Sequence, residues 1–207
     1  MNRKQPAYLI LVAVMTLLAG GSQALASEPV DPSTLNPPVP PQLNPVCERS
    51  GNQTICDVQG SDPPFAAGSE VICGSGPNTF EPFQFQNRSV QGKRYYDQDG
   101  NLVRRHYREY IDGTLVNPIN HKAVAYSGSD TAMHDLAIPG QIDTGTTAIT
   151  GSVRIFLGQG FGTMAADTGR ILDSAQGILQ VSGQHPFLDY FVYGDTAAMQ
   201  PLCDALQ

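Results

Sequence analysis

The stretch Arg94–Gly113 reads RYYDQDGNLVRRHYREYIDG, and it decides the fold that we expect for this chain. Asp99-Gly100 is a preferred hairpin turn, and the flanking residues include four tyrosines, one valine and one isoleucine, which favour strands. Two antiparallel strands should therefore meet at this turn. The same stretch holds four arginines, although the whole chain has a formal net charge of −7. Its second strand is therefore also the first place to look for a binding site.

Similar short runs, separated by Gly, Asp and Asn, follow one another from about residue 68 onward. Several of them alternate between the two faces of an extended chain, as 149–155 does, and such alternation is typical of strands. The runs cover 69–73, 83–90, 93–97, 101–111, 122–127, 131–138, 146–157, 162–167, 170–174, 178–183 and 187–194. Strands at this spacing predict an all-β fold, an antiparallel β-barrel or sandwich of about 8–10 strands.

Further turn candidates and the C-terminus complete this prediction. Asp112-Gly113 and Gln176-Gly177 have turn chemistry. The last residues, MQPLCDALQ, place Pro201 where the first turn of a helix tolerates it, and their leucine and alanine side chains share one side. We therefore expect a short C-terminal helix, the one helix that the pattern predicts.

The first 26 residues have the three-part order of a secretory signal peptide. Arg3 and Lys4 precede an apolar run, and small residues at Ala24 and Ala26 follow, so we expect cleavage after Ala26. The apolar run is shorter than the roughly 20 residues that a membrane-spanning helix needs. We therefore expect a secreted or cell-envelope protein with no membrane span in its mature form.

Removing residues 1–26 takes away two basic groups and no acidic one, so the formal charge moves from −7 to −9. Such a charge repels nucleic acid, which we exclude as a partner. Residues 27–46 are rich in proline and predict a flexible leader. Residues 47–207 have the size of a single domain with its own core. The sequence leaves the oligomeric state open.

Four cysteines follow the signal peptide, and an even number in an exported chain predicts disulfides. Cys47 and Cys56 flank ERSGNQTI, whose Ser-Gly-Asn centre should fold back and bring the two sulfurs together. The pairing that remains is Cys73–Cys203, which would tie the C-terminal helix to the β domain. A zinc site, the alternative, lacks the usual paired spacing and a nearby group of histidines.

Motifs for catalysis or metal binding are not recognisable in the sequence. The run from Asp97 lacks the glycine and glutamate of a calcium loop, and 158–162 lacks the spacing of a phosphate loop. The four histidines are scattered over different predicted strands, and His134 and Asp135 are neighbours that should point to opposite faces. We therefore expect neither a cofactor nor a metal, and the sequence favours a protein that is not an enzyme.

The arginine-rich strand has two mixed faces. One face carries Leu102, Arg104, His106, Arg108 and Tyr110, and the other carries Val103, Arg105, Tyr107, Glu109 and Ile111. Two interpretations stay open. In one, the strand is a solvated edge whose charges discourage edge pairing. In the other, Arg105, Tyr107 and Glu109 line a polar cavity that binds a small acidic or hydroxylated ligand. Their face then either has Arg105 and Glu109 paired inside the barrel or lies where the barrel opens.

The order of several motifs resembles that of a family of exported actinobacterial β-proteins without assigned function. The motifs are YYDQDGNLVRR, LVNPINHKAVAY, TGTTAITGSVRIFLGQGFGTMAADTGRILD and GQHPF, all between residues 80 and 187. The series of hairpins is similar, more loosely, to the small β-barrels of the allene oxide cyclase and dirigent type. That resemblance implies a barrel that binds apolar or phenolic compounds without a cofactor, and it supplies no catalytic residue for this chain.

These observations lead to one main functional hypothesis and two alternatives. The main hypothesis is an exported, disulfide-linked β-barrel that binds a small apolar or hydroxylated ligand, or serves a cell-envelope role, without catalysis. The first alternative is a cofactor-free isomerase or cyclase of the allene oxide cyclase or dirigent type. The second is a surface protein-interaction module.

Overall fold

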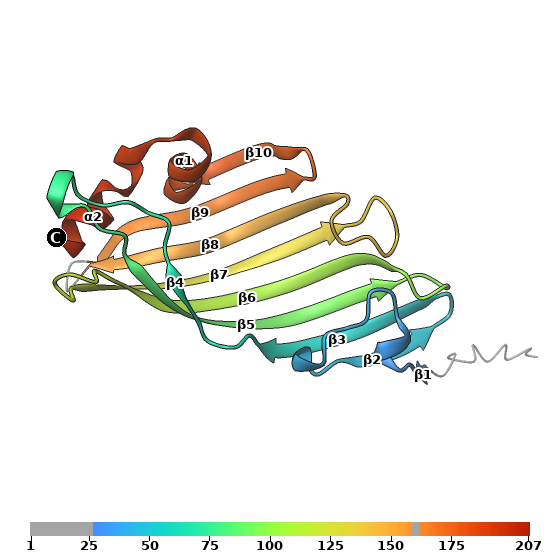
Figure 1. Ribbon diagram of the computed structural model, residues 1–207. Coiled ribbons are helices and arrows are strands. Elements are labelled where there is room, and N and C mark those ends of the chain that lie inside the picture. Colours follow the sequence, from blue (N-terminus) through green and yellow to red (C-terminus); the bar gives the residue numbers. More distant parts are fainter. Residues whose placement is uncertain (1–26, 159–161) are drawn as a thin grey trace, which may run out of the picture.

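The computed structural model describes residues 27–158 and 162–207, so the expected signal peptide, 1–26, lies outside the described residues. The described chain forms one sheet with the strand order β1-β2-β3-β5-β6-β7-β8-β9-β10, and β4 pairs with β5 beyond the end of β3 (Figure 1). The strands are β1 (Glu28–Pro29), β2 (Val46–Ser50), β3 (Gln53–Ser61), β4 (Phe65–Gly68), β5 (Phe83–Tyr96), β6 (Leu102–Val116), β7 (Ala123–Asp135), β8 (Thr146–Gly158), β9 (Gly162–Ser174) and β10 (Gly177–Gln184). The predicted antiparallel all-β class is confirmed. The sheet is open, because its two edge strands, β1 and β10, do not pair with each other in the described chain.

The predicted hairpin between β5 and β6 is confirmed. The Asp97 carboxylate accepts hydrogen bonds from the backbone N–H groups of Asp99 and Asn101, at 3.0 and 2.8 Å, and so fixes the turn. The turn predicted at Asp112-Gly113 is wrong, because both residues lie inside β6. Gly113 is required there for a different reason: a Cβ would lie 2.4 Å from the Tyr126 ring, which packs across it.

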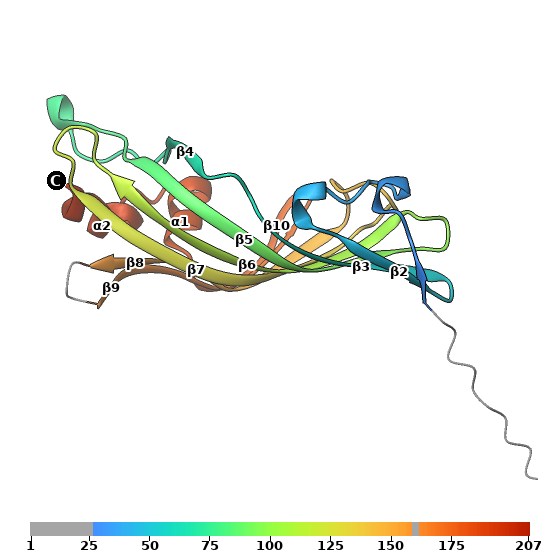
Figure 2. The ribbon, with the colours of Figure 1, turned by 90° about the horizontal axis from the view of Figure 1, so that it is seen from below.

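Three strands are longer than expected, because each continues through a glycine that the sequence placed between two strands. β5 passes Gly92, β7 passes Gly128 and β9 passes Gly169. At Gly169 φ is +136°, and a Cβ would lie 2.1 Å from the Ser182 carbonyl oxygen, so no other residue fits. Gly169 is the register partner of Gly151 on β8. Figure 2 shows that the sheet is curved, and glycines within strands permit such curvature.

Two apolar clusters pack on the same face of the sheet, one near each end. The first lies under residues 27–45, which we call the N-terminal cover, with the 3₁₀-turns η1 (Pro32–Thr34) and η2 (Pro41–Leu43). Its buried members are Leu35, Val39, Leu43, Cys47, Cys56, Val58, Val90, Tyr96 and Leu102. The flexible leader expected from the sequence is therefore wrong: three aliphatic side chains spaced among the prolines are buried, and each contributes about 1.5–3 kcal/mol.

The second cluster lies under residues 186–207, the C-terminal cover, which holds α1 (Pro186–Tyr193), η4 (Thr196–Met199) and α2 (Gln200–Leu206). Its buried members are Val71, Cys73, Phe80, Leu115, Val124, Tyr126, Phe156, Phe187, Met199, Leu202, Cys203 and Leu206. Between β4 and β5 the chain adds the 3₁₀-turn η3 (Gly76–Asn78). Figures 1 and 2 show the two covers on the same side of the sheet, near its opposite ends.

The C-terminal helix is confirmed as α2, but the strand predicted at 187–194 is wrong, because this segment forms α1. Pro186 occupies the first helical position, and Gly194 ends the helix in the left-handed conformation. These start and stop signals are present in the sequence, whereas the run of apolar and aromatic residues between them also suits a strand.

Both disulfides have the expected pairing. Cys47 and Cys56 are register partners on β2 and β3, and their sulfurs are joined across this hairpin. Cys73 is joined to Cys203, which fastens α2 to the segment before β5. In the part of the chain that the structure describes, no helix is long and apolar enough to cross a membrane.

Candidate functional site

Between the two covers, the covered face of the sheet carries a band of polar side chains, which we call the central belt. It consists of Arg88 and Arg94 on β5, Arg105, Tyr107 and Glu109 on β6, and Asp130 and His134 on β7. Neighbouring strands align these residues in register, with Arg94 opposite Arg105 and Glu109 opposite Asp130.

The structure shows which of the two alternating sets of β6 side chains lies on the covered face of the sheet. Tyr107 packs against the first cluster and Ile111 against the second, so Arg105 and Glu109, which share their parity, also lie on the covered face. Arg104, His106 and Arg108 are exposed on the opposite face. The edge-strand interpretation is wrong, because β6 is hydrogen-bonded to β5 on one side and to β7 on the other.

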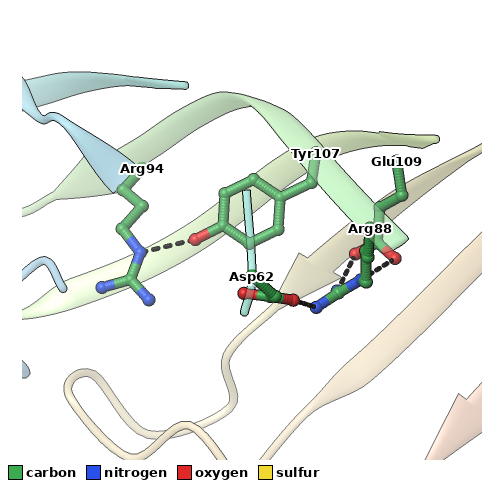
Figure 3. A network of polar contacts seen from close by, with 5 residues as sticks. All are labelled: Asp62, Arg88, Arg94, Tyr107 and Glu109. Atoms are coloured by element: carbon green, nitrogen blue, oxygen red, sulfur yellow. Dashed lines mark hydrogen bonds and ion pairs between the residues drawn. The ribbon is translucent and has the colours of Figure 1, made fainter. Parts of the chain in front are cut away.

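The first half of the central belt is an acidic group held by Arg88. The Arg88 guanidinium donates two hydrogen bonds to the Glu109 carboxylate, at 3.0 and 2.5 Å, and a third to Asp62 at 2.5 Å (Figure 3). The expected pairing of Arg105 with Glu109 is therefore wrong, because Glu109 is bound by Arg88 instead. Two carboxylates and one guanidinium leave this group with one net negative charge.

Asp130 lies beside this group and carries the largest electrostatic perturbation of a carboxyl group in the belt. Its side chain is buried, and none of the hydrogen bonds among the described residues reaches its carboxylate. Burial, together with the negative charge of Glu109, raises the pKa of Asp130 from 3.8 to about 6, although Arg88 acts in the opposite direction. Asp130 can therefore take up or release a proton near neutral pH.

The second half of the belt is built on Arg94, which is buried under the N-terminal cover. Its Nε donates to the Tyr107 hydroxyl at 2.5 Å (Figure 3). Its Nη1 donates to the Pro38 carbonyl oxygen at 3.2 Å. Nη1 also lies 3.3 Å from the Tyr96 hydroxyl, which donates to the Pro37 carbonyl oxygen. The N-terminal cover thus closes this end of the belt with its backbone carbonyl groups.

Arg105 has an unusual partner for a half-buried cation. Its Nε and Nη2 lie 3.2 and 2.7 Å from Nδ1 of His134, whose Nε2 lies 2.7 Å from the Thr144 carbonyl oxygen. Because a carbonyl oxygen only accepts, His134 is assigned as the neutral tautomer that donates from Nε2 and accepts at Nδ1. Burial, together with the charge of Arg94, lowers the pKa of Arg105, and no described carboxylate forms an ion pair with it.

An apolar row continues from Tyr107 across the rest of the sheet. Successive register partners are Ala132 on β7, Ile149 on β8, Ile171 on β9 and Val181 on β10. These four residues are partly or largely exposed and belong to neither apolar cluster. The belt therefore combines cations, acidic groups and an uncovered apolar strip on one face.

Other features of the surface lie outside the belt. A hollow of about 570 Å³ on the opposite face is lined by Lys93, His106 and Arg108, among others. Lys93 is already paired with Asp57, and Arg108 lies over the Tyr110 ring, so these cations have partners. In the central belt, by contrast, Arg105 and Asp130 have no ion-pair partner among the described residues.

The sequence predicted three residues of the belt, Arg105, Tyr107 and Glu109. It did not predict the other four, which are Arg88, Arg94, Asp130 and His134. The sequence signal for Asp130 and His134 was their even spacing with Ala132, which places all three on one face of β7. The expectation that His134 and Asp135 face opposite sides is confirmed, since Asp135 pairs with Arg104. Arg88 and Arg94 carried no such signal, because their role depends on the register between β5 and β6.

A second buried polar pair lies near the C-terminal cover: Nδ1 of His185 is 2.7 Å from the Asp167 carboxylate. Across residues 27–158 and 162–207, no group of three or more His, Cys, Asp or Glu side chains is arranged to hold a metal ion. No protein-family model matches the chain, and no curated protein or solved structure matches it. The argument about function therefore depends on the central belt itself.

Proposed function

We propose that this chain is an exported protein that binds a small organic ligand at the central belt without converting it. The observation that carries the proposal is the set of polar groups there that lack full hydrogen bonding. The Asp130 side chain is mostly buried and makes no hydrogen bond among the described residues, and Arg105 has no acidic partner there. Among the described residues the one fully buried side-chain polar atom without a partner is Thr54 Oγ1. The open bonding positions of Asp130 and Arg105 therefore reach solvent, where a bound ligand could replace water as their partner.

The surroundings of these groups support a binding site. The belt lies between the two covers, and the N-terminal cover holds Arg94 through the Pro38 carbonyl oxygen. The belt adjoins an apolar strip whose residues are partly or largely exposed. Ligand sites in proteins combine an apolar lining with a few polar groups in this way. Export is supported by the signal-peptide pattern and by the two disulfides, which persist in oxidising compartments.

The test uses the mature chain, residues 27–207, and N-phenyl-1-naphthylamine, a neutral apolar dye that fluoresces when it leaves water. We expect saturable binding of about one dye per chain. Ala132→Gln, on the belt face, should weaken this binding at least tenfold, whereas Thr131→Gln, its neighbour on the opposite face, should leave it unchanged. Circular dichroism checks that both variants are folded. Equal binding by the two variants would place the dye elsewhere and contradict the proposal.

The second candidate is a cofactor-free isomerase or cyclase, and one observation favours it. The pKa of Asp130 is about 6, so Asp130 can exchange a proton with a bound compound near neutral pH. Tyr107 and Glu109 converge on the same belt and could orient that compound. A compound that displaces the dye should then be converted by the wild-type chain and bound but not converted by Asp130→Asn. If it is recovered unchanged after incubation with the wild-type chain, the enzyme hypothesis fails for that compound.

A further inference from the structure

Two arginines placed opposite each other on neighbouring strands, Arg94 and Arg105, indicate the chemical class of the ligand. The two residues are direct register partners on β5 and β6, where neighbouring Cα atoms are about 4.5–5.5 Å apart. Like charges placed opposite each other destabilise a sheet unless something neutralises them. Neither guanidinium forms an ion pair with a carboxylate in the described residues. The pair is therefore a cationic site without a counter-ion among the described residues.

Both arginines also keep donors for a ligand. The bonds of Arg94 use Nε and Nη1, and those of Arg105 use Nε and Nη2. Nη2 of Arg94 and Nη1 of Arg105 therefore make no hydrogen bond among the described residues. The Arg94 charge acts on Arg105, so the two cations lie within electrostatic range of each other. The planar guanidinium matches the two oxygens of a carboxylate, so free donors on these two register partners suit this group well.

The acidic half of the belt limits the charge that a ligand can carry. Glu109 lies on the same face of the same strand as Arg105, four residues further on, and Asp130 lies beside it. A second negative charge on the ligand, placed toward these carboxylates, would be repelled. One carboxylate at the arginine pair is therefore favoured over a dianion that extends along the strands.

The apolar row gives the rest of the ligand a place. It starts at Tyr107, next to the arginine pair, and ends at Val181 on β10. Five strands at about 4.8 Å spacing make a row of roughly 19 Å across the strands. Ala132, Ile149 and Ile171 belong to neither apolar cluster. An apolar ligand lying along this row would therefore shield their exposed side chains from water.

We propose that the ligand of the central belt is an apolar monocarboxylate, with its carboxylate between Arg94 and Arg105 and its hydrocarbon body along Ala132, Ile149 and Ile171. This inference rests on the proposed function, because it assigns a chemical class to the ligand of the same site. It adds a statement that the proposed function does not make, namely that one negative charge on the ligand is recognised.

The experiment compares octanoate with octanamide, which has the same chain length and no charge, by isothermal titration calorimetry on residues 27–207 at pH 7.5 and low salt. Octanoate should bind at least tenfold more tightly than octanamide. Arg105→Gln should remove this difference, and Arg105→Lys should restore part of it. Arg104→Gln is the matched control on the opposite face and should change neither affinity. Circular dichroism shows whether each variant is folded.

The outcomes separate the two proposals. If octanamide binds as tightly as octanoate, or if Arg105→Gln leaves the preference intact, the anion site is wrong while ligand binding at the belt stands. If neither compound binds and the neutral dye still binds in an Ala132-dependent manner, the monocarboxylate class is wrong and the proposed function stands. If dye, octanoate and octanamide all fail to bind, both proposals are overturned.

Discussion

Glu109 and Asp130 are direct register partners on β6 and β7, and both carboxylates face the covered side of the sheet. Only one of them is neutralised, since Arg88 binds Glu109 with two hydrogen bonds and leaves Asp130 without one among the described residues. Carboxylates placed this close cannot both ionise freely, and the pKa of Asp130 is accordingly about 6. This pair makes the stability of the fold depend on pH in a direction that can be measured.

Asp130→Asn should stabilise the protein at pH 7.5 by about 1–3 kcal/mol. The native state holds the Asp130 proton more tightly than the unfolded state, in which the pKa is near 3.8. This contribution to stability is fully present below pH 4, is lost as pH rises toward 6, and stays absent above it. Urea denaturation of both proteins from pH 4 to 8 should therefore show curves that coincide at low pH and separate by pH 7. A constant difference across this range would contradict the assignment.

Arg88→Met should destabilise the protein by about 1–3 kcal/mol at pH 7.5, because it leaves Glu109 and Asp62 without their partner. It should also raise the pKa of Asp130 further above 6, since the Arg88 charge acts to lower it. Carboxyl carbon NMR titration measures the second effect separately from the first. Lys93→Met is the matched control: its pair with Asp57 is exposed, so we expect a change within about 1 kcal/mol.

The sequence predicted the all-β class, the hairpin at Asp99-Gly100, the helix α2 and both disulfides, because each depends on local residue chemistry or on the number of cysteines. The prediction failed where one local pattern is compatible with two different structures. Glycine marks a turn in the sequence, but Gly113 and Gly169 lie inside strands, where neighbouring atoms approach the Cα too closely for a side chain. The apolar run 187–194 suits both a strand and a helix, and packing of α1 on the sheet favours the helix.

The candidate site was also predictable only where local sequence determines the structure. The alternation along β6 correctly grouped Arg105, Tyr107 and Glu109 on one face, because alternation follows from strand geometry alone. Their partners could not be predicted, because Arg88 and Arg94 reach them only through the register between β5 and β6. Glu109 therefore pairs with Arg88 and not with Arg105 as a consequence of tertiary structure, which no pattern within β6 predicts.

Replacing Cys73 and Cys203 together by serine should destabilise the protein by about 5 kcal/mol, because this bond closes a loop of 130 residues in the unfolded chain. The same model gives about 2.5 kcal/mol for the Cys47–Cys56 bond, whose separation is 9 residues. Thermal denaturation of the two double variants measures the order of these effects. Hydrogen exchange should also accelerate in α2 when Cys203 is replaced. An equal or reversed order would show that loop length does not govern the stabilisation here.

Leu35→Ala should destabilise the protein by about 2–4 kcal/mol, because Leu35 is a buried residue of the N-terminal cover that packs in the first cluster, and its removal leaves a cavity. Leu179→Ala is the matched control on β10, where the side chain is 57% exposed, and should cost less than about 1 kcal/mol. Chemical denaturation of the two variants gives the comparison. A flexible leader, as the proline content alone suggests, would make the two substitutions equally mild. The larger effect of Leu35→Ala would instead show that this proline-rich segment is part of the folded domain and helps to hold Arg94 in the central belt.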